Sequence, residues 1–243
     1  MSVGTVLLAA LGTALATGLG ALPFKLVARP SRAWLGTANA LAAGSMAGAS
    51  IGLISEGVAY GSGRAAAGLV FGAAFIAVAG RLIGRDGHRR FQRPLGSDAR
   101  AMVLIVGVMT IHSFTEGVGV GVSFGGGEEL GLVIALAIAV HNIPEGLAIS
   151  LLLVPRGVRV SRASAWSIFS SLPQPLMAVP AFLFVESFEP VLPLGLGFAA
   201  GAMLWMVAVD LLPEAMRVAP AWRVAAVAAL AAGAMVGLQA ILL

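Results

Sequence analysis

The sequence predicts an all-α membrane protein, and three observations support this prediction. Of the 243 residues, 59% are hydrophobic and only 11% are charged, and the mean hydropathy is +0.97. A soluble domain carries roughly 25% charged residues, so this chain has too few polar side chains to cover a water-exposed surface. Glycine is abundant, with 32 residues, and small residues let membrane helices approach closely. The third observation is a series of long apolar stretches.

These stretches recur along the whole chain. A membrane helix needs about 20 mostly apolar residues. Eight stretches meet this requirement and are predicted to be spans: 2–23, 33–55, 64–84, 99–123, 129–154, 161–185, 191–214 and 220–242. The first is interpreted as a retained helix rather than a signal peptide, because basic residues follow its apolar run instead of preceding it. The gaps between spans leave no room for a soluble domain, so residues 1–243 are predicted to form a single transmembrane domain.

The basic residues predict the orientation of these spans. All but one of the 15 Lys and Arg residues fall in loops on the same side, the exception being Arg64. Loops rich in Lys and Arg stay in the cytoplasm. Both termini are therefore predicted to be extracytoplasmic, and the basic loop at about residues 85–100 is predicted to be cytoplasmic. This asymmetry explains the net charge of +4 without a nucleic-acid partner.

Two copies of one motif carry the chemistry. The chain has three histidines, and two of them open the segments His112–Gly117 (HSFTEG) and His141–Gly146 (HNIPEG). In each segment a Glu follows the His by four residues, which places both side chains on one helix face. A single histidine inside a membrane usually just hydrogen-bonds a neighbour. Two copies at matched depth indicate a metal site instead, because buried carboxylates cost several kcal/mol unless they are paired, protonated or metal-bound.

The ligand types narrow the choice of metal. Imidazole nitrogen combined with carboxylate oxygen suits Zn²⁺, Fe²⁺ or Ni²⁺ better than Mg²⁺ or Ca²⁺. Cysteine is absent, so thiolate ligands and disulfides are excluded. The predicted principal ligands are His112, Glu116, His141 and Glu145, between spans 99–123 and 129–154. Met46 in the second span is a further candidate ligand, and Gln174 of the sixth span is placed to reach the same site.

Internal symmetry indicates what such a site would do. The two motif segments would run in opposite directions in an eight-span chain. A second pair of similar segments, Ala42–Met46 and Ala199–Met203, also falls in oppositely directed spans. Inverted repeats are a common plan of secondary transporters with a site near the bilayer midplane. Metal transport is therefore the leading hypothesis. An intramembrane metal-dependent hydrolase using the same ligands, or a metal-binding membrane protein that does not transport, are the alternatives.

The chain resembles the ZIP (Zrt-, Irt-like protein) family of metal transporters, especially its small bacterial members. The segment His141–Gly146 is the most specific part of the resemblance, followed by His112–Gly117. The resemblance implies a 3+2+3 helix arrangement, a homodimer and a location in the inner cell membrane. It also implies uptake of Zn²⁺, or of Fe²⁺, Mn²⁺ or Cd²⁺, toward the cytoplasm. The ion is then a transported substrate, so neither a cofactor nor an enzymatic activity is expected.

The resemblance also assigns roles to single residues. His112, Glu116, His141 and Glu145 match the main metal site of the family, Met46 a ligand from the second span, Asn142 a polar position of an adjacent second site, and Asp210 an acidic position on the inner exit route. Ser113 and Gln174 depart from the pattern, since many members have Asn and Glu there. A second dication would leave about two uncompensated positive charges, so one tightly held metal is predicted.

Overall fold

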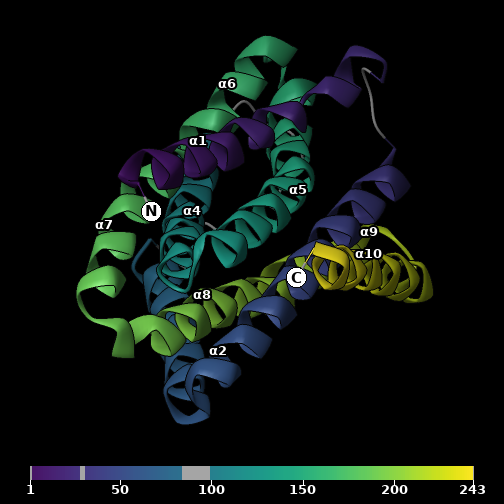
Figure 1. Ribbon diagram of the computed structural model, residues 1–243. Helices are drawn as coiled ribbons and strands as arrows, with labels where there is room; N and C mark the ends of the chain where they lie inside the picture. Colours follow the sequence, from purple (N-terminus) through teal and green to yellow (C-terminus); the bar gives the residue numbers. More distant parts are fainter. Residues whose placement is uncertain (1, 28–30, 84–98, 243) are drawn as a thin grey trace.

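The computed structural model describes residues 2–27, 31–83 and 99–242, and this part of the chain contains helices and no strands. The principal helices are α1 (Val3–Leu19), α2 (Arg32–Ile83), α4 (Ala99–Gly125), α5 (Glu128–Leu153), α6 (Val160–Ser171), α7 (Pro173–Ser187), α8 (Leu192–Met206), α9 (Leu212–Val218) and α10 (Ala221–Leu242). Figure 1 shows them as one bundle in which α4 and α5 lie among the others. The predicted all-α class is confirmed. The predicted basic loop falls almost entirely outside the described residues.

Six helical stretches within the described ranges are long and apolar enough to cross a membrane. They are Val3–Lys25, Ala33–Leu82, Glu128–Arg156, Val160–Ser187, Glu189–Val218 and Ala221–Leu242. The protein is therefore a multi-pass membrane protein. The stretch Ala33–Leu82 contains the predicted span 33–55 and all but the last two residues of the predicted span 64–84. Helix α4 coincides with the predicted span 99–123 but is not among the six.

Helix α2 is divided by a sharp turn. Gly61 has non-helical backbone angles, φ 159° and ψ 97°. A Cβ atom added to Gly57 would lie only 3.3 Å from the Cβ of Ala65. Residues eight apart on a straight helix are separated by about 12 Å along its axis, so the chain must turn back between these two residues. The two predicted spans are thus the two arms of α2, whose turn lies at the bottom of Figure 1.

Glycines set the packing of each arm against a different helix. A Cβ added to Gly68 would lie 2.0 Å from the Leu194 carbonyl oxygen, and one added to Gly72 would lie 1.9 Å from that of Phe198. The register advances by four residues on both helices, so the second arm of α2 runs parallel to α8. A Cβ added to Gly44 would likewise lie 2.2 Å from the Ala228 carbonyl oxygen, where the first arm packs on α10. Only glycine permits such close backbone contacts.

The glycine that ends each His/Glu motif also allows another helix to pack closely. A Cβ added to Gly117 of α4 would lie 2.5 Å from the carbonyl oxygen of Gln174 in α7. A Cβ added to Gly146 of α5 would lie 1.7 Å from the carbonyl oxygen of Thr17 in α1. The glycine of each motif therefore admits a third and a fourth helix to the pair that carries the histidines. These two contacts bring α7 and α1 against the site.

Prolines have different effects in two of the helices. The predicted span 161–185 is broken into α6 and α7, with Pro173 as the first residue of α7. Proline is well tolerated there because it lacks the backbone N–H that would be unpaired in a first helical turn. Pro144, by contrast, lies inside α5, which continues through it from Glu128 to Leu153. The fifth span therefore remains one helix and carries its motif on a continuous face.

Candidate metal centre

Four side chains from α4 and α5 converge in the interior of the bundle. His112 and Glu116 come from α4, and His141 and Glu145 come from α5. One ligand atom of each side chain can be chosen so that all four atoms lie within 4.8 Å of one another. All four residues are buried, with exposed fractions between 0% and 3%. The structure thus brings together the four residues that the two motifs predict as principal ligands.

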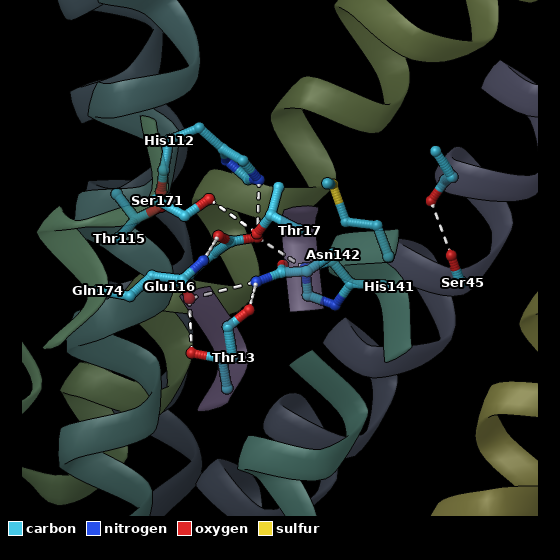
Figure 2. A network of polar contacts seen from close by, with 12 residues as sticks. Thr13, Thr17, Ser45, His112, Thr115, Glu116, His141, Asn142, Ser171 and Gln174 are labelled. Carbon is cyan, nitrogen blue, oxygen red and sulfur yellow. Dashed lines mark hydrogen bonds and ion pairs between the residues drawn. The ribbon is translucent and has the colours of Figure 1, made fainter. Parts of the chain in front are cut away.

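Glu116 is the centre of this group. Its Oε1 atom lies 3.0 Å from Nε2 of His112 and 2.6 Å from Nε2 of His141. Its second oxygen, Oε2, accepts a hydrogen bond of 2.5 Å from Nε2 of Gln174. Figure 2 shows the carboxylate between the two imidazoles and the Gln174 amide. Both oxygens of Glu116 are therefore engaged, and one of them faces both rings.

Glu145 differs from Glu116 in its surroundings. It is 3% exposed, and neither of its carboxylate oxygens has a hydrogen-bond partner among the described residues. A buried carboxylate without a partner is costly. A dication held between Glu116 and Glu145 would supply the missing interaction and would balance both charges. The same ion would have two imidazole nitrogens within reach.

The spacing of the ligand atoms is compact. Zn²⁺ bonds of about 2.0–2.1 Å in tetrahedral geometry hold ligand atoms about 3.3 Å apart. The two distances from Glu116 Oε1 to imidazole nitrogen, 3.0 and 2.6 Å, are shorter than this. The 2.6 Å contact requires a proton between nitrogen and oxygen. A bound Zn²⁺ would therefore take the place of a proton and would hold these atoms about 0.3 Å and about 0.7 Å further apart.

A second layer of polar residues surrounds Glu116. Gln174 receives hydrogen bonds at Oε1 from the Thr13 hydroxyl, at 2.5 Å, and from Asn142 Nδ2, at 3.2 Å. Asn142 Nδ2 also donates to the Thr13 carbonyl oxygen at 2.9 Å. Gln174 and Asn142 are predicted metal ligands, and here Asn142 donates to Gln174, which in turn donates to Glu116. Sequence reasoning missed Thr13, although hydroxyl residues four apart on an apolar helix, Thr13 and Thr17, were a signal.

The remaining predicted residues lie outside the His/Glu group of four. Ser113 is fully buried on α4 beside His112, and its hydroxyl has no partner in the described part of the chain. Met46 is buried in the largest apolar core cluster, which also contains Ile138 of α5. Asp210 lies in a π-helical turn, Val207–Leu211, outside the group of four. Metal ligation by these residues, and a place for Asp210 on an exit route, remain predictions.

The fold and this site together define a class: an α-helical, multi-pass membrane protein with a buried His/Glu centre of metal-binding type. Comparison with known proteins then identifies the family. The family model of the ZIP zinc transporter matches residues 84–239. The chain is 35% identical over 233 residues to the zinc transporter GufA of Myxococcus xanthus, covering 88% of this chain and 89% of that protein. The chain belongs to the ZIP zinc transporter family, as the resemblance of its motifs predicted.

Two further relatives are similar over different extents. A provisionally named zinc transporter of Arabidopsis thaliana is 48% identical over 242 residues, which cover 98% of this chain but only 39% of that protein. The zinc transporter ZIPB of Bordetella bronchiseptica is 34% identical over 134 residues, which cover 55% of this chain and 42% of its own length. The chain thus spans well under half of the plant relative and most of GufA. The family consists of transporters rather than enzymes.

Proposed function

We propose that this protein transports a divalent transition-metal ion, with Zn²⁺ as the preferred substrate, across the inner cell membrane toward the cytoplasm. The observation that carries the proposal is the convergence of four buried ligand atoms, two imidazole nitrogens and two carboxylate oxygens, within 4.8 Å. Nitrogen and oxygen ligands of this kind suit Zn²⁺, with Fe²⁺, Mn²⁺ and Cd²⁺ as related substrates. The ion is the substrate, and no resident cofactor is involved. Membership of the ZIP family supports transport over an intramembrane hydrolase.

The proposal includes a topology of eight spans in a 3+2+3 arrangement with extracytoplasmic termini. The parallel packing of helix pairs supports it. The second arm of α2 runs parallel to α8, and α4 runs parallel to α7, because glycine contacts on both members advance in the same direction. In an eight-span chain these pairs are spans three and seven, and spans four and six, which cross the membrane in the same direction. The arginine-rich loops support the orientation. A homodimer belongs to the same proposal.

The proposed site holds one metal ion. Glu116 and Glu145 supply two negative charges, which balance one dication. The side chains around them, Ser113, Asn142 and Gln174, are neutral. A second dication nearby would therefore be uncompensated in a medium of low dielectric constant.

Ion influx into proteoliposomes tests the proposal directly. Purified protein reconstituted in liposomes that contain a metal-sensitive dye is expected to admit Zn²⁺ and Cd²⁺ faster than protein-free liposomes. Competition among Zn²⁺, Fe²⁺, Mn²⁺ and Mg²⁺ would then rank the substrates, with Mg²⁺ expected to be ineffective. Binding of Zn²⁺ to the folded protein without influx would contradict transport and indicate a non-transporting metal-binding protein.

The affinity for metal is expected to fall as the pH falls. Imidazole and carboxylate ligands bind metal only when deprotonated, so protons compete with the ion. Between pH 7.5 and pH 5 the Kd for Cd²⁺, measured by calorimetry in detergent, is expected to rise by about tenfold or more. Helical content measured at both pH values controls for unfolding. An equal Kd at the two pH values would count against ligation by His112 and His141.

A further inference from the structure

The polar network around the metal centre extends to the first helix. Thr13 lies in α1, far along the chain from both motifs, and is 1% exposed. Its hydroxyl donates to Gln174 Oε1 at 2.5 Å, and its carbonyl oxygen accepts from Asn142 Nδ2 at 2.9 Å. The hydroxyl oxygen also lies 2.7 Å from the Ala10 carbonyl oxygen, so its single proton is shared between that carbonyl and Gln174 Oε1. Figure 2 shows Thr13 at the end of this chain of contacts.

The network matters because it orients the Gln174 side chain. A carboxamide has a donor end and an acceptor end of nearly the same size, and its neighbours decide which way it points. Here the donor end, Nε2, meets Glu116 Oε2, while the acceptor end, Oε1, meets Thr13 and Asn142. A reversed amide would place Oε1 against the Glu116 carboxylate and the NH₂ group against the NH₂ group of Asn142. Both contacts would be repulsive.

The orientation of Gln174 in turn fixes Glu116. With Oε2 held by the amide, the other oxygen, Oε1, is directed toward the imidazoles of His112 and His141. Without the amide, the carboxylate could rotate and share its oxygens differently among its neighbours. Partners that orient metal ligands in this way commonly contribute ten- to hundredfold to metal affinity.

We infer that Thr13 is a positioning residue of the metal site, acting through Gln174 to fix the ligand Glu116. This inference rests on the proposed function, in which Glu116 binds the transported ion. It assigns α1, which carries none of the predicted ligands, an indirect part in metal affinity. Its effect is expected on the Kd of the ion and on the KM of transport rather than on the folding of the helix pair.

The chain offers a matched control on the same helix. Thr17 is fully buried one turn further along α1, and its hydroxyl lies 2.8 Å from that of Ser171 in α6. This pair joins α1 to the broken sixth span much as Thr13 does. No hydrogen bond links Thr17 to Gln174 or Glu116 in the described structure. Thr13→Val and Thr17→Val thus remove equivalent hydroxyls with the same change of shape, but only the first touches the network around Glu116.

The test measures the Kd for Cd²⁺ by calorimetry and the KM and maximal rate of influx in proteoliposomes. Thr13→Val is expected to raise Kd and KM by about tenfold, and Thr13→Ser, which keeps the hydroxyl, to restore them to within about twofold of wild type. Thr17→Val is expected to change Kd by less than about twofold. An unchanged Kd in Thr13→Val, or an equal rise in Thr17→Val, would overturn the inference.

A double-mutant cycle tests whether Thr13 acts through Gln174. In a Gln174→Leu background the orienting amide is absent, so adding Thr13→Val is expected to raise Kd by less than a further twofold. Fully additive effects would overturn the inference. Glu116→Gln serves as the reference for the proposed function itself. If Glu116→Gln weakens binding and Thr13→Val does not, only the positioning role fails; if Glu116→Gln binds Cd²⁺ like wild type, both fail.

Discussion

Replacing Glu116 by glutamine is expected to abolish saturable metal influx and to weaken Cd²⁺ binding by more than a hundredfold. The substitution keeps the shape of the side chain but removes the negative charge that faces both imidazoles. Loss of an outer partner of a metal ligand commonly costs ten- to hundredfold in affinity, and loss of a charged ligand should cost more. A dication would then meet a single carboxylate, that of Glu145, in a low-dielectric interior.

The same substitution at an exposed position provides the control. Glu129 lies in the first turn of α5 and is exposed, so Glu129→Gln removes an equal charge away from the site. Its influx and Kd are expected to match wild type. Calorimetry with Cd²⁺ and dye-based influx measure both variants. Saturable influx by correctly folded Glu116→Gln protein at the wild-type rate would contradict the assignment of Glu116 as a ligand.

Replacing Gly146 by alanine is expected to lower the melting temperature by about 10 °C or to prevent the protein from accumulating. The added Cβ would lie 1.7 Å from the carbonyl oxygen of Thr17 and 2.7 Å from its carbonyl carbon. These are backbone atoms, so no side chain can rotate away, and α1 must separate from α5. Overpacking of this kind costs about 3 kcal/mol or more, which corresponds to a shift of that size for a domain of about 240 residues.

Gly12 provides the comparison, because it is exposed on α1 and an added Cβ would have no atom within 4 Å. Gly12→Ala is expected to leave the melting temperature unchanged or slightly higher, since alanine favours the helix. Melting in detergent, followed by circular dichroism, distinguishes the two variants. Separation of α1 from α5 would also pull the Thr13 carbonyl from Asn142, so any folded Gly146→Ala protein should bind Cd²⁺ more weakly. A melting temperature equal to that of Gly12→Ala would refute the close packing of α1 on α5.

The pairing of the candidate ligands within each motif could be predicted because it depends on local geometry. A helix places residues four apart on one face, so each His-x-x-x-Glu segment presents its two ligands together without knowledge of the fold. The cost of burying carboxylates in hydrocarbon then makes a shared ion the natural explanation for two such segments. The same reasoning could not separate the roles of Glu116 and Glu145. Their sequence contexts are equivalent, yet one has both oxygens engaged and the other has neither.

Gln174 illustrates the opposite case. From the sequence it is a polar residue between two prolines, equally suited to bind metal or to orient a neighbour. The structure shows its amide donating to Glu116 and its carbonyl oxygen receiving two hydrogen bonds. In this geometry Gln174 supports Glu116, and its interpretation as a direct ligand remains a prediction. The departure from Glu, predicted to weaken a second metal site, also supplies the N–H that a carboxylate would lack.

The sequence by itself determined that this protein is helical, lies in a membrane and carries two His-x-x-x-Glu segments, because composition and helical periodicity act locally along the chain. Only the tertiary structure decided that α2 turns back at Gly61, that the motif glycines admit α1 and α7, and that Thr13 reaches the centre. Thr13 and Gln174 are 161 positions apart, and their hydrogen bond exists only because α1 packs against the site. In an apolar chain many helix pairings bury similar surfaces. The close fit of glycines against backbone carbonyls selects among them, and that fit cannot be derived from one helix at a time.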